Sequence, residues 1–240
     1  MIGAFLNALG ILAGALTGLT RQQTLTVRTQ NFFRAALGIF AVFFGLHLIW
    51  LSVNGTIVNG LKQILLAALA MVLGNWFGKL TGLQRLSNRA GRYAANLLAE
   101  AHKHPPAKPV DGLLAATILF CASPLGIFGA VVDGLSGYFY LLALKAVMDG
   151  LAMISFAKMF RWPVALSALP VLVFFDTVAL VTHQYGAPWL DAHHWTDSVN
   201  AVTGFVSCAT ALVIFEVRRV ELANYLPALA LAPLLTRLLG

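Results

Sequence analysis

Charged residues are scarce in this chain. Asp, Glu, Lys and Arg together make up 10% of its 240 residues, whereas they make up about a quarter of a soluble globular protein. Apolar residues reach 59%, and the mean hydropathy is +0.81. A single hydrophobic core in a chain of 240 residues cannot bury so much apolar surface, so lipid must solvate most of that surface. The composition excludes an ordinary soluble fold and predicts an integral membrane protein.

Cysteine is almost absent, and the first span carries no charge. Cys121 and Cys208 both lie within apolar segments, where neither a disulfide framework nor a zinc site with its usual spacing can be recognised. The segment MIGAFLNALGILAGALTGL has no basic residues and no small-residue cleavage signal. It therefore predicts a membrane span rather than a removed signal peptide. We expect no cofactor and no metal.

Apolar runs of about 20 residues, the length at which a helix crosses about 30 Å of hydrocarbon, recur along the chain. No segment alternates with a period of two, so helices are expected rather than barrel strands. The predicted fold is an all-helical polytopic membrane protein, a single domain within the lipid bilayer. The eight predicted spans are 2–20, 35–53, 61–80, 113–132, 138–159, 163–182, 199–215 and 222–238.

Basic residues are distributed unevenly between the connections. Of the 16 Lys and Arg residues, 13 follow the first, third, fifth or seventh span, and only Lys62 and Arg237 lie on the other side. The positive-inside rule then places both termini outside the cytoplasm. Because these residues occupy loops between apolar spans, the net charge of +7 predicts no nucleic-acid partner. The longest connection, 81–112, is expected to be a basic surface helix followed by a proline-rich linker.

Two parts of the chain share a short pattern. LNALGIL at 6–12 matches LSALPVL at 166–172, and Thr17 and Thr177 keep the same offset. The matches predict a three-span unit that occurs twice, at 1–80 and 163–240, around central spans at 113–159. The two units would run in opposite directions, as in many secondary transporters. Chance similarity between Leu- and Ala-rich segments is the alternative.

The fourth predicted span contains Ser123-Pro124 near its middle. Proline removes a backbone hydrogen bond, and Ser-Pro is a good helix start, so we expect either two half-helices or a simple kink. The second half-helix would expose free N–H groups and the positive end of its dipole, a site for an anion or a carbonyl oxygen. Gly126 and Gly129 permit close backbone approach in either case.

Three charged residues lie deep within predicted spans, away from the span ends. Lys145 and Asp149 are four residues apart on one helical face. A charge near the bilayer centre costs roughly 2.5 to 3.5 kcal/mol on insertion scales, so the pair is expected either to neutralise itself or to bind a solute or relay protons. Asp176 has no basic neighbour in the sequence. We expect it to face a water-filled path and to exchange a proton there, and an ion pair with Lys145 from another helix is the alternative.

Other polar residues in or beside the spans have two interpretations each. Asn7 and Asn224 would supply uncharged ligands or hydrogen bonds between helices. Asp133 would bind a solute or cap the Gly-rich turn that precedes the fifth span. The segment 183–197 contains His and Asp but no Lys or Arg. We expect it to be a solvated acidic loop, with a metal-capturing vestibule as the alternative.

Motifs of several enzyme classes fail. GNWFGKLT at 74–81 has the wrong glycine spacing for a phosphate loop and lacks the Ser or Thr that should follow its lysine. Neither a G-x-S-x-G elbow nor an H-E-x-x-H helix is present. We therefore expect no ATP-driven motor and no enzymatic activity.

Three segments carry a family resemblance: GAFLNALGILAGALTG, FCASPLGIFGAVVDGLSG followed by LLALKAVMDG, and NYLPALALAP. The sequence resembles the YqgA/YdfK-like family of bacterial inner-membrane proteins, domain of unknown function 554, over essentially the full chain. The resemblance implies an inner-membrane location and a transport role, and it names no substrate. The residues that match the family motif are Pro124, Gly129, Asp133, Gly134, Gly137, Lys145, Asp149, Asn224 and Pro227.

Together these features favour a secondary transporter, an ion- or proton-coupled carrier for a small polar or charged solute. Lys145 and the half-helix at Ser123 would attract an anionic group, while Asp149 or Asp176 would carry a coupling proton or cation. An ion channel is the second interpretation, followed by a membrane-embedded enzyme and an assembly protein. A homodimer would suit so small a transporter. The predicted solute- or ion-binding residues are Ser123, Pro124, Gly126, Gly129, Asp133, Lys145, Asp149, Asp176, Asn7 and Asn224.

Overall fold

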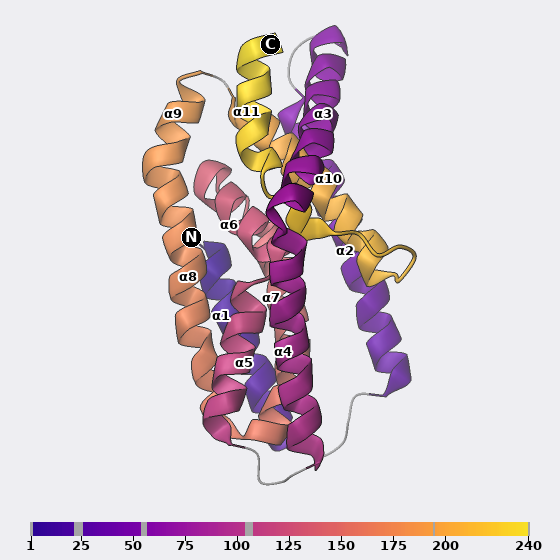
Figure 1. Ribbon diagram of the computed structural model, residues 1–240, viewed down its shortest axis with the longest axis vertical. Coiled ribbons are helices and arrows are strands. Elements are labelled where there is room, and N and C mark those ends of the chain that lie inside the picture. Colours follow the sequence, from indigo (N-terminus) through magenta and orange to yellow (C-terminus); the bar gives the residue numbers. More distant parts are fainter. Residues whose placement is uncertain (1, 22–25, 54–56, 104–107, 194, 240) are drawn as a thin grey trace.

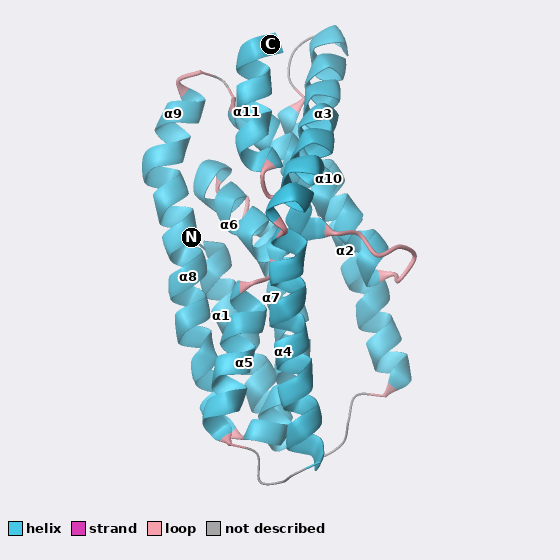
Figure 2. Ribbon diagram, in the orientation of Figure 1, coloured by secondary structure: helices cyan, strands magenta, loops and turns pink. Residues whose placement is uncertain are grey.

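The computed structural model describes residues 2–21, 26–53, 57–103, 108–193 and 195–239, and the regular elements within them are all helices (Figures 1 and 2). The all-helical prediction is thereby confirmed. The elements are α1 (Ile2–Thr20), α2 (Val27–Ser52), α3 (Ile57–Thr81), α4 (Leu83–Lys103), α5 (Pro109–Cys121), α6 (Pro124–Ser136), α7 (Tyr140–Phe160), η1 (Trp162–Ser167), α8 (Ala168–Val181), η2 (Thr182–Gly186), α9 (Ala187–Asp191), α10 (Thr196–Ile214), η3 (Leu222–Tyr225) and α11 (Ala228–Leu239).

Within the described ranges, seven helical segments are long and apolar enough to cross a bilayer, and the bent pair α5–α6 makes an eighth when it counts as one span. They correspond one to one with the predicted spans. Large apolar side chains such as Phe43, Leu65 and Trp76 are exposed on them. Helices of this length with apolar outer faces imply contact with the lipid bilayer.

The helix that contains α8 is longer than predicted. It runs from Trp162 to Asp191, and α10 begins at Thr196, so the expectation of an acidic loop over 183–197 is wrong for residues 183–191 and 196–197. A π-helical turn, η2, shifts the pattern of backbone hydrogen bonds just before Pro188, which lies in the first turn of α9. The missing N–H of Pro188 therefore does not end the helix. His183 lies in that turn, and its Nδ1 is 3.1 Å from the carbonyl oxygen of Gly134 in α6.

Helices α1 and α7 pack closely along a stripe of small residues. Gly10 lies against Ala146, and Gly14 lies against Gly150 one turn further along both helices, so the two helices run parallel. A Cβ added to Gly14 would lie 2.1 Å from the carbonyl oxygen of Gly150. Only glycine permits this approach, which is the usual role of small residues spaced four apart between membrane helices.

The parallel direction of α1 and α7 bears on how the chain crosses the membrane. Counted with α5–α6 as one span, α1 is the first span and α7 the fifth, and these two must run the same way. If α5–α6 turned back on itself while α4 stayed outside the bilayer, the two helices would be antiparallel. Their packing fits a central pair that crosses.

Two further pairs are antiparallel. In the first, Gly45 of α2 lies against Gly204 and Cys208 of α10, and the Ser207 hydroxyl donates to the carbonyl of Ala41 at 2.8 Å. In the second, Gly74 of α3 lies against Ala228 of α11, and Gly78, one turn further along α3, lies against the backbone of Asn224, which precedes α11. Small residues again set these distances, so most of the bundle is held by close backbone contact.

Helix α4 is the basic helix predicted after the third span. Its apolar side, which includes Ala94 and Leu97, packs against the hydrophobic core beside α5, while Arg85, Arg89 and Arg92 are exposed. Figure 1 shows α4 extending from the end of α3 alongside α5. Its location on the inner membrane surface stays a prediction. Part of the predicted proline-rich linker, 104–107, lies outside the described residues.

The fourth span is broken where Ser123-Pro124 predicted. Helix α5 ends at Cys121, α6 begins at Pro124, and their axes differ by 59°. Ser123 occupies the N-cap position with an extended backbone, but its hydroxyl makes no capping hydrogen bond, contrary to the expectation from the Ser-Pro pair. The backbone N–H of Gly126 donates to the Ser123 carbonyl at 3.1 Å. The two half-helices are confirmed.

Candidate functional site

A buried ion pair lies on α7. The Lys145 ammonium donates to a carboxylate oxygen of Asp149, one turn further along. The two residues are only 1% and 7% exposed. Four-residue spacing on a helix brings both side chains to one face, as the sequence predicted. The membrane interior gives such a pair strong mutual attraction, but each charge also loses its hydration.

Two aromatic rings enclose the ammonium group. Lys145 Nζ lies 5.7 Å from the ring centre of Phe120 in α5 and 5.1 Å from that of Phe175 in α8. Both distances allow cation–π attraction in a desolvated setting. Gly126 in α6 leaves the space for this cluster, because a Cβ there would lie 2.4 Å from the Phe175 ring and 2.6 Å from Lys145 Cε. The rings escaped sequence analysis, since one Phe in an apolar run gives no pattern.

Asn7 of α1 lies close to the Asp149 carboxylate. Its side chain is fully buried and acts on the Asp149 carboxylate, but neither its amide nitrogen nor its amide oxygen reaches full hydrogen-bond geometry with a partner among the described residues. A buried amide without a partner costs about 1–3 kcal/mol, so such groups in native structures call for an explanation. The unused donors and acceptor of Asn7 offer hydrogen bonds to a bound polar group.

The break between α5 and α6 lies beside this pair. Cys121, the last residue of α5, is half-buried and close enough to Lys145 and Asp149 for both charges to act on its thiol. Gly126 in the first turn of α6 contacts Lys145 directly. Five helices, α1, α5, α6, α7 and α8, thus converge on one polar spot in an otherwise apolar core. We call it the central site, which consists of Asn7, Phe120, Cys121, Gly126, Lys145, Asp149 and Phe175.

Asp133 and Gly129, two other predicted ligands, lie further along α6. The Asp133 carboxylate accepts a hydrogen bond from the backbone N–H of Gly3 at 3.0 Å, so it stabilises the start of α1. Gly129 lets α6 approach Leu142 of α7, to which a Cβ at Gly129 would be 3.1 Å away. Both positions have a structural explanation, and their role as ligands stays a prediction.

Asn224 and Asp176 are not gathered into the central site. The Asn224 amide accepts from the backbone N–H of Gln84 at 3.2 Å and donates to Glu221 at 2.8 Å, which ties η3 to the start of α4. Asp176 follows Phe175 on α8 but is half-buried and forms no ion pair with Lys145 among the described side chains. Predicted roles for both in solute binding remain untested.

Comparison with known proteins identifies the family of this chain. The model of a family described as "Protein of unknown function (DUF554)" matches residues 2–237. The chain belongs to this family. It is 30% identical over 233 residues to an uncharacterized protein, YqgA, of Escherichia coli (strain K12), with 97% of this chain and 94% of the relative covered. It is 24% identical over 237 residues to an uncharacterized membrane protein, YdfK, of Bacillus subtilis (strain 168), with the same coverage. No solved structure matches.

Proposed function

We propose that the protein is a secondary transporter and that the central site binds a small polar or charged solute. The observation that carries the proposal is the Lys145–Asp149 pair, buried beside a helix break and next to the buried amide of Asn7. Ionisable residues inside a membrane bundle usually mark a solute or ion path. Broken helices are the elements with which many transporters form their binding sites.

The central site favours an anionic group on the solute. Helix α6 begins beside Lys145, and its first turn presents the positive end of the helix dipole. Lys145 adds a full positive charge, which the Asp149 carboxylate partly neutralises. A solute anion would compete for Lys145, and Asp149 would then be released to carry a coupling proton or cation.

Alternating access would come from two inverted units. Helices α1, α2 and α3 of the proposed first unit contact α8, α10 and α11, their counterparts in the second. The repeat also aligns Asn7 with Ser167, and both are fully buried with side chains that reach no hydrogen-bond partner within the described ranges. These agreements support the repeat, and rocking of the units around α5–α6 would expose the central site to each side in turn.

The composition of the core favours a carrier over a channel. A channel needs polar rings along its pore, whereas the core around the central site is formed by Ala, Phe, Val and Met side chains. We place the protein in a bacterial inner membrane with both termini outside the cytoplasm, on the strength of the basic connections. No chemical conversion of the solute is part of the proposal. A homodimer stays a prediction.

Transient currents from proteoliposomes on a solid-supported membrane test the proposal. Wild-type protein is challenged with panels of anions and cations and with pH steps, alongside Lys145→Ala and Asp149→Asn. Asp111→Asn, a carboxylate change in the first turn of α5, serves as the matched control. We expect a saturable transient that both central-site variants abolish and the control retains.

Two other outcomes contradict the proposal. A sustained current that does not saturate with solute concentration would indicate a channel. A saturable transient that persists unchanged in Lys145→Ala and Asp149→Asn would place the solute elsewhere in the bundle.

A further inference from the structure

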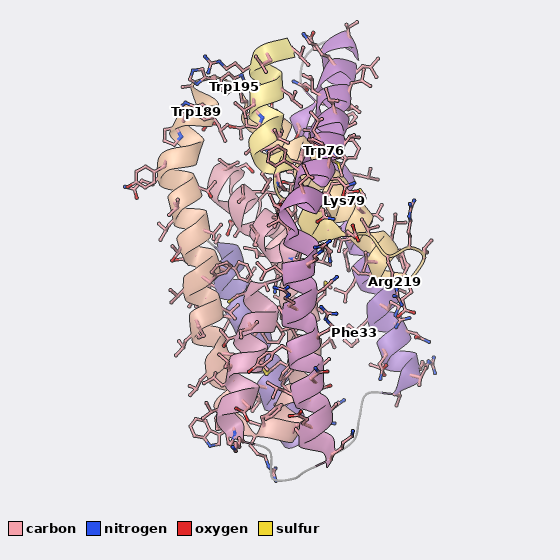
Figure 3. All side chains as sticks on the ribbon, viewed as in Figure 1. Phe33, Trp76, Lys79, Trp189, Trp195 and Arg219 are labelled. Atoms are coloured by element: carbon pink, nitrogen blue, oxygen red, sulfur yellow. The ribbon has the colours of Figure 1, made fainter. Side chains whose placement is uncertain are left out.

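A cavity of about 570 Å³ lies between α2 and α7, and a second of about 540 Å³ adjoins it between α1, α2 and α7. They share Phe33, Leu151 and Ile154 as lining residues, so we treat them together as the α2–α7 groove. The groove exists because α2 packs mainly on α10. Figure 1 shows α2 diverging from the central helices toward its first residue, and Figure 3 shows Phe33 on its inner side.

The groove is apolar inside and charged at one end. Phe33, Leu37, Met148 and Leu151 form walls within it. Its charged lining residues are Arg21, Arg34, Lys158 and Glu216. They gather at one end because α1 and α7 run parallel and end there, α2 begins there, and α10 ends there. Three cations and one carboxylate leave this end with a net positive charge.

The groove is separate from the central site. Met148, Leu151 and Ser155 line it from one face of α7, whereas Lys145 and Asp149 occupy another face, toward the rings of α5 and α8. Helix α7 therefore stands between the two. A solute path through the central site does not account for the groove or for its basic end.

A strained residue lies at the basic end. Glu216 has a φ of 58°, a left-handed conformation that is unfavourable for a residue with a Cβ, and its carboxylate lies 2.9 Å from the Arg34 guanidinium. The Arg34 side chain is 45% exposed and that of Glu216 is 68% exposed. Exposed ion pairs are weak and readily exchanged. The Glu216 carboxylate thus occupies a position where a stronger anion would be held by Arg34.

We propose that the α2–α7 groove binds an anionic phospholipid. Its phosphate would take the Arg34 guanidinium from Glu216 and contact Lys158, and one acyl chain would lie along Phe33 and Leu151. Basic pockets between membrane helices are the usual sites for anionic lipid headgroups. Along α1 the groove extends from Gly10 to Arg21, about 16 Å at 1.5 Å per residue. That depth matches about half of a 30 Å hydrocarbon layer, which is one leaflet.

Native mass spectrometry of the detergent-purified protein tests the proposal. Phosphatidylglycerol and phosphatidylcholine of equal chain length are titrated in competition, and the retained lipid is counted. We expect wild-type protein to retain phosphatidylglycerol at least about tenfold better, and Arg34→Ala with Lys158→Ala to lose this preference. Arg85→Ala with Arg89→Ala, two exposed cations on α4, is the matched control and should keep it.

Two further variants separate the headgroup from the chain. Glu216→Gln removes the competing carboxylate and should strengthen phosphatidylglycerol retention. Ser155→Trp fills the groove and should weaken the retention of that lipid while Arg34 and Lys158 stay in place. Size-exclusion profiles identify any variant that fails to fold.

Several results would overturn the assignment. Equal retention of the two lipids by wild-type protein would show that no anionic site exists. If the α4 control loses the preference for phosphatidylglycerol equally, the effect comes from the net charge of the protein and not from the groove. Complete displacement of the lipid by millimolar inorganic phosphate would indicate a site for a free anion. None of these results depends on whether the central site transports a solute.

Discussion

Breaking the Lys145–Asp149 pair should be far more damaging than removing it. Both side chains are almost fully buried, so a variant that keeps only one leaves an uncompensated charge in the core. Removing one partner of a buried pair typically costs about 3–5 kcal/mol, whereas replacing both by apolar residues is often neutral or stabilising. We therefore expect Lys145→Met and Asp149→Leu each to destabilise the protein by about 3–5 kcal/mol. The double variant should recover most of that loss.

The assay is thermal unfolding of detergent-purified protein, followed by the fraction that remains monodisperse. For a chain of this size, about 1 kcal/mol corresponds to roughly 2–4 °C, so each single variant should melt about 6–20 °C below wild type. The reasoning is refuted if the double variant is as unstable as the worse single variant, or if both single variants melt within about 2 °C of wild type. A stable double variant without transport would show that the pair is kept for function.

Two more predictions follow from close contacts. Gly14→Ala should lower the free energy of unfolding by about 1–3 kcal/mol, because its Cβ would meet the carbonyl oxygen of Gly150. Gly91→Ala, with open space around it in α4, is the control and should raise the free energy of unfolding by about 0.4–1 kcal/mol. Equal shifts in melting temperature would contradict the close α1–α7 contact. Asp133→Ala should lower the free energy of unfolding by about 1.5–3 kcal/mol, because it removes the hydrogen bond that the carboxylate accepts from Gly3. Backbone hydrogen exchange at the start of α1 should then become faster, and unchanged exchange there would argue against this role.

Much of this structure could be predicted from the sequence, where a local pattern has only one physical outcome. Apolar run lengths predicted the spans, and Ser123-Pro124 predicted the break, because proline cannot donate in mid-helix. The spacing of Lys145 and Asp149 predicted their contact, because residues four apart share a helical face. Each of these features depends on residues that are neighbours in the chain.

The remaining features depend on contacts between distant segments. Phe120 and Phe175 enclose Lys145 from two other helices, and nothing distinguishes them in the sequence from the other phenylalanines. Asp133 holds the start of α1 through a residue 130 positions away. The segment after Thr182 was predicted as a loop from its polar residues, but a π-helical turn continues the helix past Pro188. Polarity reports exposure, and it does not report where a helix ends.

Alternating access requires water and solute to reach the α5–α6 break from each side of the membrane in turn. Cys121 lies at that break, half-buried beside the ion pair, so its thiol reports access without knowledge of the solute. In a Cys208→Ser background, a membrane-impermeant maleimide is applied to vesicles of either orientation, with Cys121→Ser as the control. We expect Cys121 to be labelled from both sides and the control to remain unlabelled. Labelling from one side alone, or only after denaturation, would contradict alternating access.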